Sequence, residues 1–254
     1  MTAPTSNMRS LDRAFDVLAV LQDAKQPIRL SEIARSSGLH IATAQRIVNV
    51  LLDRGYAART ADGYTAGPAA LAVAHAFMVS NPLSLLAQTT LQQLASSTGY
   101  TASLFVRVEK SRVLIGRVES SNPLSYVLPV GERLPLHLGG AGKVMLAEMG
   151  ADELEATLPG GDSITLASGT SMTRADLLAQ LDTIRTEGHA ISVSERSYGI
   201  ASVAAPVRSP DGKLAAVLGV TGPADTLTES QISRLVTEVR WAATNLGNRI
   251  PVSS

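Results

Sequence analysis

The chain of 254 residues contains no cysteine, and only 4% of its residues are aromatic. Without a thiol, the chain cannot form a disulfide framework, a cysteine-ligated zinc site, an iron–sulfur cluster or a thiol nucleophile. Net charge is absent too, because 22 basic residues balance 22 acidic ones. With 45% hydrophobic residues the chain can still bury a core, which excludes disorder as a description of the whole.

Several signals of enzymes and of secretion are also missing. The four histidines show no metal-ligand spacing, and there is no G-x-S-x-G nucleophile elbow. The segment GGAGKV is not a phosphate-binding loop, because His137 stands where its first glycine should be and Val144 replaces Ser or Thr. We therefore expect no enzyme, no cofactor and no metal. The first residues, MTAPTSNM, lack the apolar core of a signal peptide, so a cytoplasmic location is expected.

Charge is missing altogether between Gly63 and Val106. The uninterrupted apolar stretch inside this segment, from Ala69 to Val79, has 11 residues and includes His75. A membrane span needs about 20 residues, and Asn81-Pro82 breaks the stretch. The pattern favours a buried interface and no contact with a membrane.

The zero net charge hides a small asymmetry. Residues 1–80 hold eight basic and six acidic residues, a net charge of +2, which leaves 14 basic and 16 acidic residues, a net charge of −2, for residues 81–254. The difference hints at an anionic partner for the N-terminal part.

The first 67 residues show the pattern of a winged helix-turn-helix. Apolar residues at helical spacing predict helices over 10–22, 31–37 and 41–54. The first has Leu11, Phe15, Leu18 and Leu21 on one face, and Ser31 can cap the second. Two short strands over 56–59 and 64–65 flank an Asp-Gly turn, which is a strong hairpin signal. Three helices followed by a hairpin match the motif.

The third helix carries a polar side that suits DNA. Opposite its apolar stripe lie Ala42, Gln45, Arg46 and Asn49, with Thr43 at the edge. Gln and Asn can bind adenine edges, Arg can bind guanine or phosphate, and a Thr methyl can meet thymine. Arg59 on the wing and Arg9 before the first helix are candidate phosphate contacts. The alternatives are an ordinary solvated helix face and free surface arginines.

The C-terminal half alternates hairpins with helices. Strand pairs are predicted over 101–108 with 113–118 and over 202–207 with 213–220, and uncharged helices over about 68–80 and 82–97 precede them. Thr173 and Thr228 begin capped helices, and the last helix ends at Gly247. This order predicts an α+β fold with a mostly antiparallel sheet.

The order of these segments resembles the IclR family of transcriptional regulators. The segments that carry the resemblance are LSEIARSSGLH, IATAQRIVNVLLDRGYAART, RVESSNPLSYVLPVGERLPLHLGGAGKVMLA and SERSYGIASVAAPVRSPDGKLAAVLGVTGP. The resemblance implies a winged helix-turn-helix domain over 1–67, a linker helix over 68–80 and a GAF-like effector domain over 81–254. It also implies double-stranded operator DNA, a small organic-acid effector, and a homodimer or dimer of dimers. Where the family often has Pro-Lys-Ser, this chain has His40, Ile41 and Ala42, which suggests a different operator preference.

The same resemblance implies an effector pocket. Matched position by position, it is formed by Gly140, Ala141, Ser192, Ser202, Gly219 and Thr221, with Tyr126 and Leu134 as apolar walls. A glycine turn before a helix exposes N–H groups that can receive a carboxylate, although it can also serve close packing alone. Ser192 and Ser202 replace a frequent acid and thiol, and Gly219 replaces a hydroxyl residue and opens space. We therefore expect an effector bulkier than a small keto acid, such as an aromatic acid near Tyr126.

These patterns predict a sequence-specific DNA-binding regulator, a repressor rather than an activator, controlled by a small carboxylate or aromatic acid. Two other functions remain open. The chain could be a ligand-sensing module whose helix-turn-helix serves protein contacts, or a small-molecule hydrolase.

Overall fold

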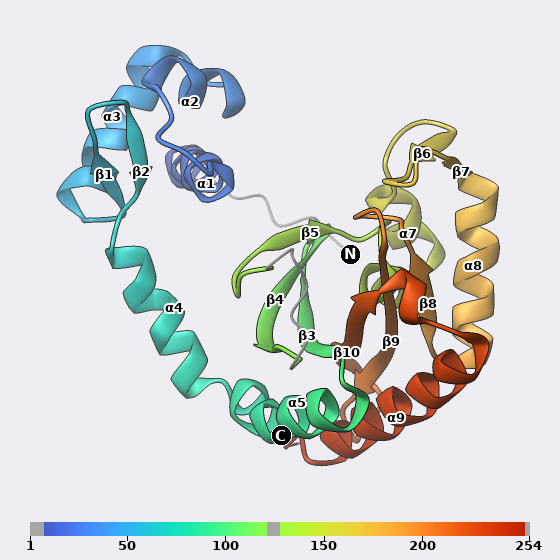
Figure 1. The fold of residues 1–254 in the computed structure, drawn as a ribbon. Helices are drawn as coiled ribbons and strands as arrows, with labels where there is room; N and C mark the ends of the chain where they lie inside the picture. The colour runs from blue at the N-terminus through green and yellow to red at the C-terminus, as the bar shows by residue number, and fades with distance from the viewer. Residues whose placement is uncertain (1–7, 121–127, 252–254) are drawn as a thin grey trace. The chain divides into compact units, whose positions relative to one another are not determined.

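The computed structural model describes residues 8–120 and 128–251. The chain divides into two compact units, Met1–Ser80 and Asn81–Ser254, each with its own hydrophobic core (Figure 1).

The first unit is a small helical domain with a two-stranded wing. Its elements in chain order are α1 (Arg9–Asp23), α2 (Leu30–Ser36), α3 (Ile41–Asp53), β1 (Ala57–Arg59), β2 (Tyr64–Ala66) and α4 (Ala69–Ser80). Val17 and Leu21 of α1, Ile33 of α2, and Val48 and Leu51 of α3 form the core among the first three helices. The predicted three helices and hairpin are confirmed.

One local expectation in this unit is wrong, and one predicted face is only partly buried. Ser31 does not cap α2, because the helix begins one residue earlier and its cap position is Arg29, whose N–H donates to the Glu32 carboxylate at 3.1 Å. The predicted apolar face of α1 is only half buried: Leu21 lies in the core, but Leu11 and Phe15 are 45% and 59% exposed. Apolar periodicity identifies the face, yet none of the residues that the structure describes in this unit buries Leu11 or Phe15.

The second unit is built on one antiparallel sheet. Its strands are β3 (Thr101–Val108), β4 (Ser111–Val118), β5 (Arg133–Pro135), β8 (Ala190–Val193), β9 (Ile200–Arg208) and β10 (Leu214–Pro223). They lie in the order β5-β4-β3-β10-β9-β8, and every neighbouring pair is antiparallel. A separate small hairpin joins β6 (Ser163–Thr165) to β7 (Ser171–Thr173). Both hairpins that the sequence predicts, β3–β4 and β9–β10, are present.

Helices cover both faces of this sheet, as Figure 1 shows. On one face lie α5 (Pro82–Thr98) and α9 (Glu229–Asn248); on the other lie α6 (Gly140–Ala147) and α8 (Arg174–Glu187), with α7 (Ala151–Thr157) adding to the same core. Thr173 and Thr228 cap α8 and α9 by accepting the N–H groups of Asp176 and Gln231. The predicted α+β fold, with a helix-turn-helix unit and an antiparallel-sheet unit, is confirmed.

The uncharged helices are the only ones that approach the composition of a membrane span in the part of the chain that the structure describes. No single helix there is long and apolar enough to cross a membrane, although α4 and α5, taken as one bent pair, have the length and the composition of a membrane span. Six residues of α5 are buried within the second unit, whereas α4 has no buried residue.

Candidate DNA-reading face and ligand pocket

The polar side of α3 is exposed. Ala44, Val48 and Leu51 are buried on one side of the helix, so the residues on the opposite side face solvent. Ala42, Arg46 and Asn49 are exposed, whereas Thr43 and Gln45 are partly exposed at the edge. The Gln45 amide donates from Nε2 to Oδ1 of Asn49 at 2.8 Å, which orients the two side chains relative to each other. These predicted residues therefore form one contiguous surface on a single helix. We call this surface the reading face.

The two candidate phosphate contacts lie on other elements of the same unit. Arg59 is exposed on β1, opposite Tyr64 of β2, and its guanidinium carbon lies 5.8 Å from the centroid of the Tyr64 ring. This cation–π contact positions the Arg59 side chain on the wing. Arg9 is the first residue of α1 and is exposed.

The second candidate site is a pocket on the sheet face that α6 covers. Its volume is about 60 Å³, several times the roughly 10–15 Å³ that one water molecule needs. Seven of the residues named from the sequence line it: Leu134, Gly140, Ala141, Ser192, Ser202, Gly219 and Thr221. Tyr126 lies outside the residues that the structure describes.

The register of the sheet explains why these distant positions meet. Ser192 on β8 pairs with Ser202 on β9, and Ser202 pairs with Thr221 on β10, so three hydroxyls form one row across the sheet. Two residues along, Gly219 on β10 pairs with Ser103 on β3. Side chains two residues apart share a face of a strand, so both rows face the same pocket.

The glycine turn before α6 serves both packing and exposure of donors. A Cβ at Gly142 would collide with the Leu136 carbonyl oxygen and the Arg112 guanidinium, so only glycine lets α6 lie this close. The N–H of Gly139 donates to the Glu195 carboxylate at 2.9 Å. No residue that the structure describes accepts from the N–H of Gly140 or Ala141, as expected in the first turn of a helix.

Glycine at position 219 has a second role besides the expected one. A Cβ there would lie 2.9 Å from the carbonyl oxygen of Val203 on the neighbouring strand and 3.2 Å from the Cβ of Ala204. The glycine therefore relieves crowding against β9, in addition to leaving the pocket face without a side chain.

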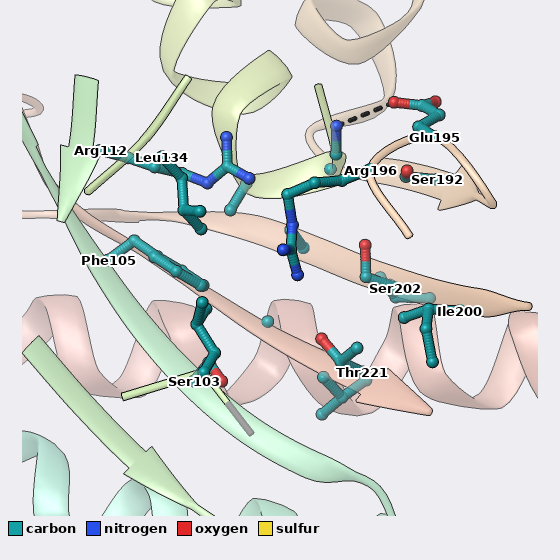
Figure 2. Close-up of a pocket in the computed structure, with 18 of the residues that line it drawn as sticks. Ser103, Phe105, Arg112, Leu134, Ser192, Glu195, Arg196, Ile200, Ser202 and Thr221 are labelled. Atoms are coloured by element: carbon teal, nitrogen blue, oxygen red, sulfur yellow. Dashed lines mark hydrogen bonds between the residues drawn. The ribbon is translucent and has the colours of Figure 1, made fainter. Parts of the chain in front are cut away.

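The sequence did not point to three arginines that line the pocket, namely Arg112 and Arg117 on β4 and Arg196 in the loop after β8. Figure 2 shows Arg112 and Arg196 projecting into the space between the sheet and the start of α6, with Phe105 below them. The guanidinium carbon of Arg112 lies 5.6 Å from the centroid of the Phe105 ring. A charged residue on a strand is usually interpreted as facing solvent. The one sequence feature that could have indicated otherwise is Gly116, next to Arg117, because an isolated glycine in a strand suggests a bulge.

A buried ion pair closes the pocket next to the glycine turn. Lys143 of α6 is 2% exposed, and its ammonium group donates to the Glu195 carboxylate and, at 2.9 Å, to Oε1 of Gln180 on α8. Glu195 therefore holds together the loop after β8, the glycine turn and α6.

Electrostatics at the pocket are dominated by burial of positive charge. Burial, and next the nearby Arg196, lower the pKa of Arg112 below its ordinary value, while Glu195 acts in the opposite direction. Burial, and next Arg112, lower the pKa of His137 below its usual 6.5, so this imidazole is neutral at pH 7. The folded protein thus holds the Arg112 charge at a cost, which a bound anion would reduce.

The fold and these two sites define a class of protein: a helix-turn-helix DNA-binding unit joined to a domain with a small-molecule pocket. Comparison with known proteins gives the family. The model of the IclR helix-turn-helix domain matches residues 10–61, and that of the C-terminal domain of IclR bacterial transcriptional regulators matches residues 75–248. The chain belongs to the IclR family of transcriptional regulators.

Relatives support this assignment along the whole chain. The HTH-type transcriptional regulator BhcR of Paracoccus denitrificans is 30% identical over 95% of this chain and 87% of its own length. The acetate operon repressor of Salmonella typhimurium is 24% identical over 95% of this chain and 90% of its own. The same fold occurs in an IclR homologue from Microbacterium hydrocarbonoxydans solved with 4-hydroxybenzoate, at a TM-score of 0.74 and 22% identity over 94% of this chain and 97% of that one.

Proposed function

We propose that the reading face of α3 recognises operator DNA in the major groove. Gln45 and Asn49 would bind adenine edges, Arg46 a guanine or a phosphate, and the Thr43 methyl a thymine, while the small Ala42 lets the helix approach closely. Arg59 on the wing and Arg9 at the start of α1 would hold the DNA backbone. The observation that carries this proposal is the contiguous exposed polar surface on α3.

The pocket of the second unit is the site for a small organic-acid effector. The N–H groups of Gly140 and Ala141 at the positive end of α6 and the hydroxyls of Ser202 and Thr221 supply donors for a carboxylate. Ser192 and Leu134 form further parts of the wall, and Gly219 forms part of the floor. The effector is bound and released unchanged, so the protein is a regulator without catalytic activity.

Subunit pairing accounts for the apolar surface of the first unit. Helix α4 has no charged residue and no buried residue, and its Leu71 and Val73 are 72% and 57% exposed. A helix that is apolar all round is normally covered, and a second copy of α4, together with Leu11 and Phe15 of α1, would cover it. We assign residues 1–67 to DNA binding, 68–80 to the linker and 81–254 to the effector domain of a homodimer or dimer of dimers.

Regulation follows from coupling the two units. A coupling free energy of about 1–3 kcal/mol would change operator affinity about 5- to 150-fold, enough for a switch. The acetate operon repressor among the relatives supports repression as the direction of control. The protein would act in the cytoplasm, where its operator lies.

Gel-shift titration of the full chain tests the DNA-reading proposal, with DNA from upstream of its own and neighbouring genes. Arg46→Ala and Gln45→Ala should each weaken specific binding roughly 10- to 100-fold, the range for loss of one base contact. Arg54→Ala is the matched control, because Arg54 is an exposed arginine at the opposite end of α3. Equal binding by all variants would show that α3 is not the reader, and no binding by any protein would favour protein contacts.

Thermal unfolding with a panel of small and aromatic carboxylates, including 4-hydroxybenzoate, tests the effector proposal. Binding to the folded state raises the melting temperature with ligand concentration. Stabilisation by an aromatic or longer acid supports the expected bulk, and stabilisation by two- and three-carbon acids alone contradicts it. Mass spectrometry of the recovered ligand tests for turnover, which would contradict a purely regulatory role.

A further inference from the structure

Arg112 is a buried arginine whose guanidinium group uses only part of its hydrogen-bonding capacity. The residue lies on β4 and is 2% exposed. Its Nη1 donates to the carbonyl oxygen of Pro135 on β5. Its Nε is buried without an acceptor, and its Nη2 donates to none of the residues that the structure describes. Buried donors on a charged group are costly when they lack an acceptor, so an acceptor from a ligand would stabilise the folded protein.

The two free donors lie on one edge of the guanidinium group. Nε and Nη2 project their N–H groups side by side from the same edge of this planar fork, whereas the Pro135 carbonyl occupies Nη1. Two parallel N–H groups match the two oxygens of a carboxylate. The bond to Pro135 and the contact with the Phe105 ring, 5.6 Å from the guanidinium carbon, hold the group in place. The free edge is therefore a preformed receptor for a planar oxyanion.

This edge lies beside the start of α6. Nη2 of Arg112 lies 3.2 Å from the position of a Cβ at Gly139, and Oγ of Ser202 lies 3.3 Å from that of a Cβ at Gly140. The N–H groups of Gly140 and Ala141 have no acceptor among the described residues. All five residues line the pocket. Donors from a side chain, a backbone turn and a hydroxyl group thus gather at one end of the pocket.

The charge of Arg112 has the wrong sign for its position. The N-terminus of a helix carries a partial positive charge, which attracts anions and repels cations. The Glu195 carboxylate is bound to Lys143 and to the N–H of Gly139, and it makes no ion pair with Arg112 in the part of the chain that the structure describes. Glu195 favours the charge on Arg112, but burial and Arg196 outweigh it and lower the pKa of Arg112. An anion bound at this end of the pocket would stabilise both the guanidinium group and the helix terminus.

We propose that Arg112 binds the carboxylate of the effector through two hydrogen bonds, from Nε and Nη2, next to the N–H groups at the start of α6. The proposal rests on the effector pocket proposed above and adds a charged residue that determines its specificity. This residue selects an ionised carboxylate over uncharged groups of the same shape. A carboxamide fits the same space, but it has no charge and offers one oxygen where the carboxylate offers two.

Calorimetric titration of the full chain with matched acids and amides tests this selection. The pairs are 4-hydroxybenzoate with 4-hydroxybenzamide, 3-phenylpropanoate with 3-phenylpropanamide, and butyrate with butyramide, at pH 7 and constant ionic strength. In the pair that binds best, the acid should bind about tenfold or more tighter than the amide, as expected for charged hydrogen bonds. Equal or tighter binding of the amides overturns the proposal.

Substitution of Arg112 makes the test specific to this residue. Arg112→Met keeps most of the side-chain length without the charge, and it should lower the preference for the acid at least about fivefold. Arg133→Met is the matched control, because Arg133 lies on the adjacent strand β5, pairs with Glu109 and lies outside the pocket lining. The control should keep the preference of the wild type. An unchanged preference in folded Arg112→Met overturns the assignment.

A measurement on the wild-type chain separates ligand binding from the structural bond to Pro135, and it holds even if Arg112→Met does not fold. In the chain labelled with ¹³C and ¹⁵N, the Nε–H signal of Arg112 is assigned by triple-resonance spectroscopy. A saturating acid should move this signal downfield, because Nε gains a charged acceptor, and the matched amide should move it less. A signal that the acid leaves in place overturns the proposal, since a purely structural arginine would behave in that way.

The outcomes separate this proposal from the one on which it rests. If the chain binds acids and the preference over amides survives the loss of Arg112, the organic-acid effector stands and the role of Arg112 is excluded. If the chain binds none of the acids, 4-hydroxybenzoate included, the organic-acid effector itself is wrong.

Discussion

The reading face and the effector pocket are assembled in opposite ways. The reading face consists of side chains on one helix, within eight residues of sequence, and its members contribute little to the core. The pocket draws on β3, β4, β5, β8, β9, β10 and the start of α6, and several of its members are also packed structural residues. Substitutions on the reading face should therefore change binding alone, whereas many substitutions in the pocket should also change stability.

Glu195→Ala should give the largest effect. It removes the partner of a fully buried ammonium and the acceptor of the Gly139 N–H, so the free energy of unfolding should fall by about 3–5 kcal/mol. Denaturant unfolding measures this. Glu153→Ala, which breaks the exposed pair with Arg107, should cost at most about 1 kcal/mol. Similar losses in both variants would contradict the structural role of the buried pair.

Gly142→Ala should follow in size, with a loss of about 1–3 kcal/mol, because its methyl group would collide with the Leu136 carbonyl and the Arg112 guanidinium. Gly150→Ala is the control, since a Cβ there meets nothing within 4 Å. Thermal unfolding of the two variants side by side checks this. If Gly142→Ala unfolds like wild type, the turn is not tightly packed and its glycines are free to serve ligand binding alone.

Gln45→Ala and Asn49→Ala should show coupled effects on operator affinity. Each side chain orients the other through one hydrogen bond, so the double variant should lose less than the sum of the single losses, by about 0.5–1.5 kcal/mol. A double-mutant cycle by gel shift gives this coupling, and unfolding curves should stay within about 0.5 kcal/mol of wild type. Additive losses would mean that the two amides contact DNA independently.

Arg59→Ala should have the smallest effect. A phosphate contact adds affinity without sequence preference, so its loss should weaken binding to all DNA alike and reduce the slope of log affinity against log salt by about 1. Titrations at several salt concentrations, with operator and with unrelated DNA, measure this. A loss confined to the operator would move Arg59 from backbone contact to base recognition.

The sequence patterns predicted those helices and strands that are determined by residues close together in the chain. The three helices, the Asp-Gly wing, both long hairpins and the Thr228 cap follow from periodicity and turn chemistry. The exposure of Leu11 and Phe15 could not be read from the same periodicity, because an apolar face looks alike whether its own domain or a partner covers it.

The residues of the pocket also fall into a group that was predicted and a group that was not. The positions of Gly140, Ser202 and Thr221 in it were anticipated through a family resemblance, whereas the arginines were not. Arg117 faces the pocket because of a bulge in the strand pairing, and Arg196 lies in a loop whose course depends on Glu195. Neither the bulge nor the course of this loop produces a periodic pattern in the sequence.

The strand order gives the pocket a mechanical consequence. Leu134 lies on β5 and Ser192 on β8, and these are the first and last strands of the six-stranded sheet. A molecule that touches both acts as a brace between the two edges, which hydrogen bonding alone connects only through the four strands in between. Ligand binding should therefore slow amide hydrogen exchange in the outermost strands more than in the central ones. The edge strands open most easily, so the two edges of the sheet are where ligand binding changes the domain most.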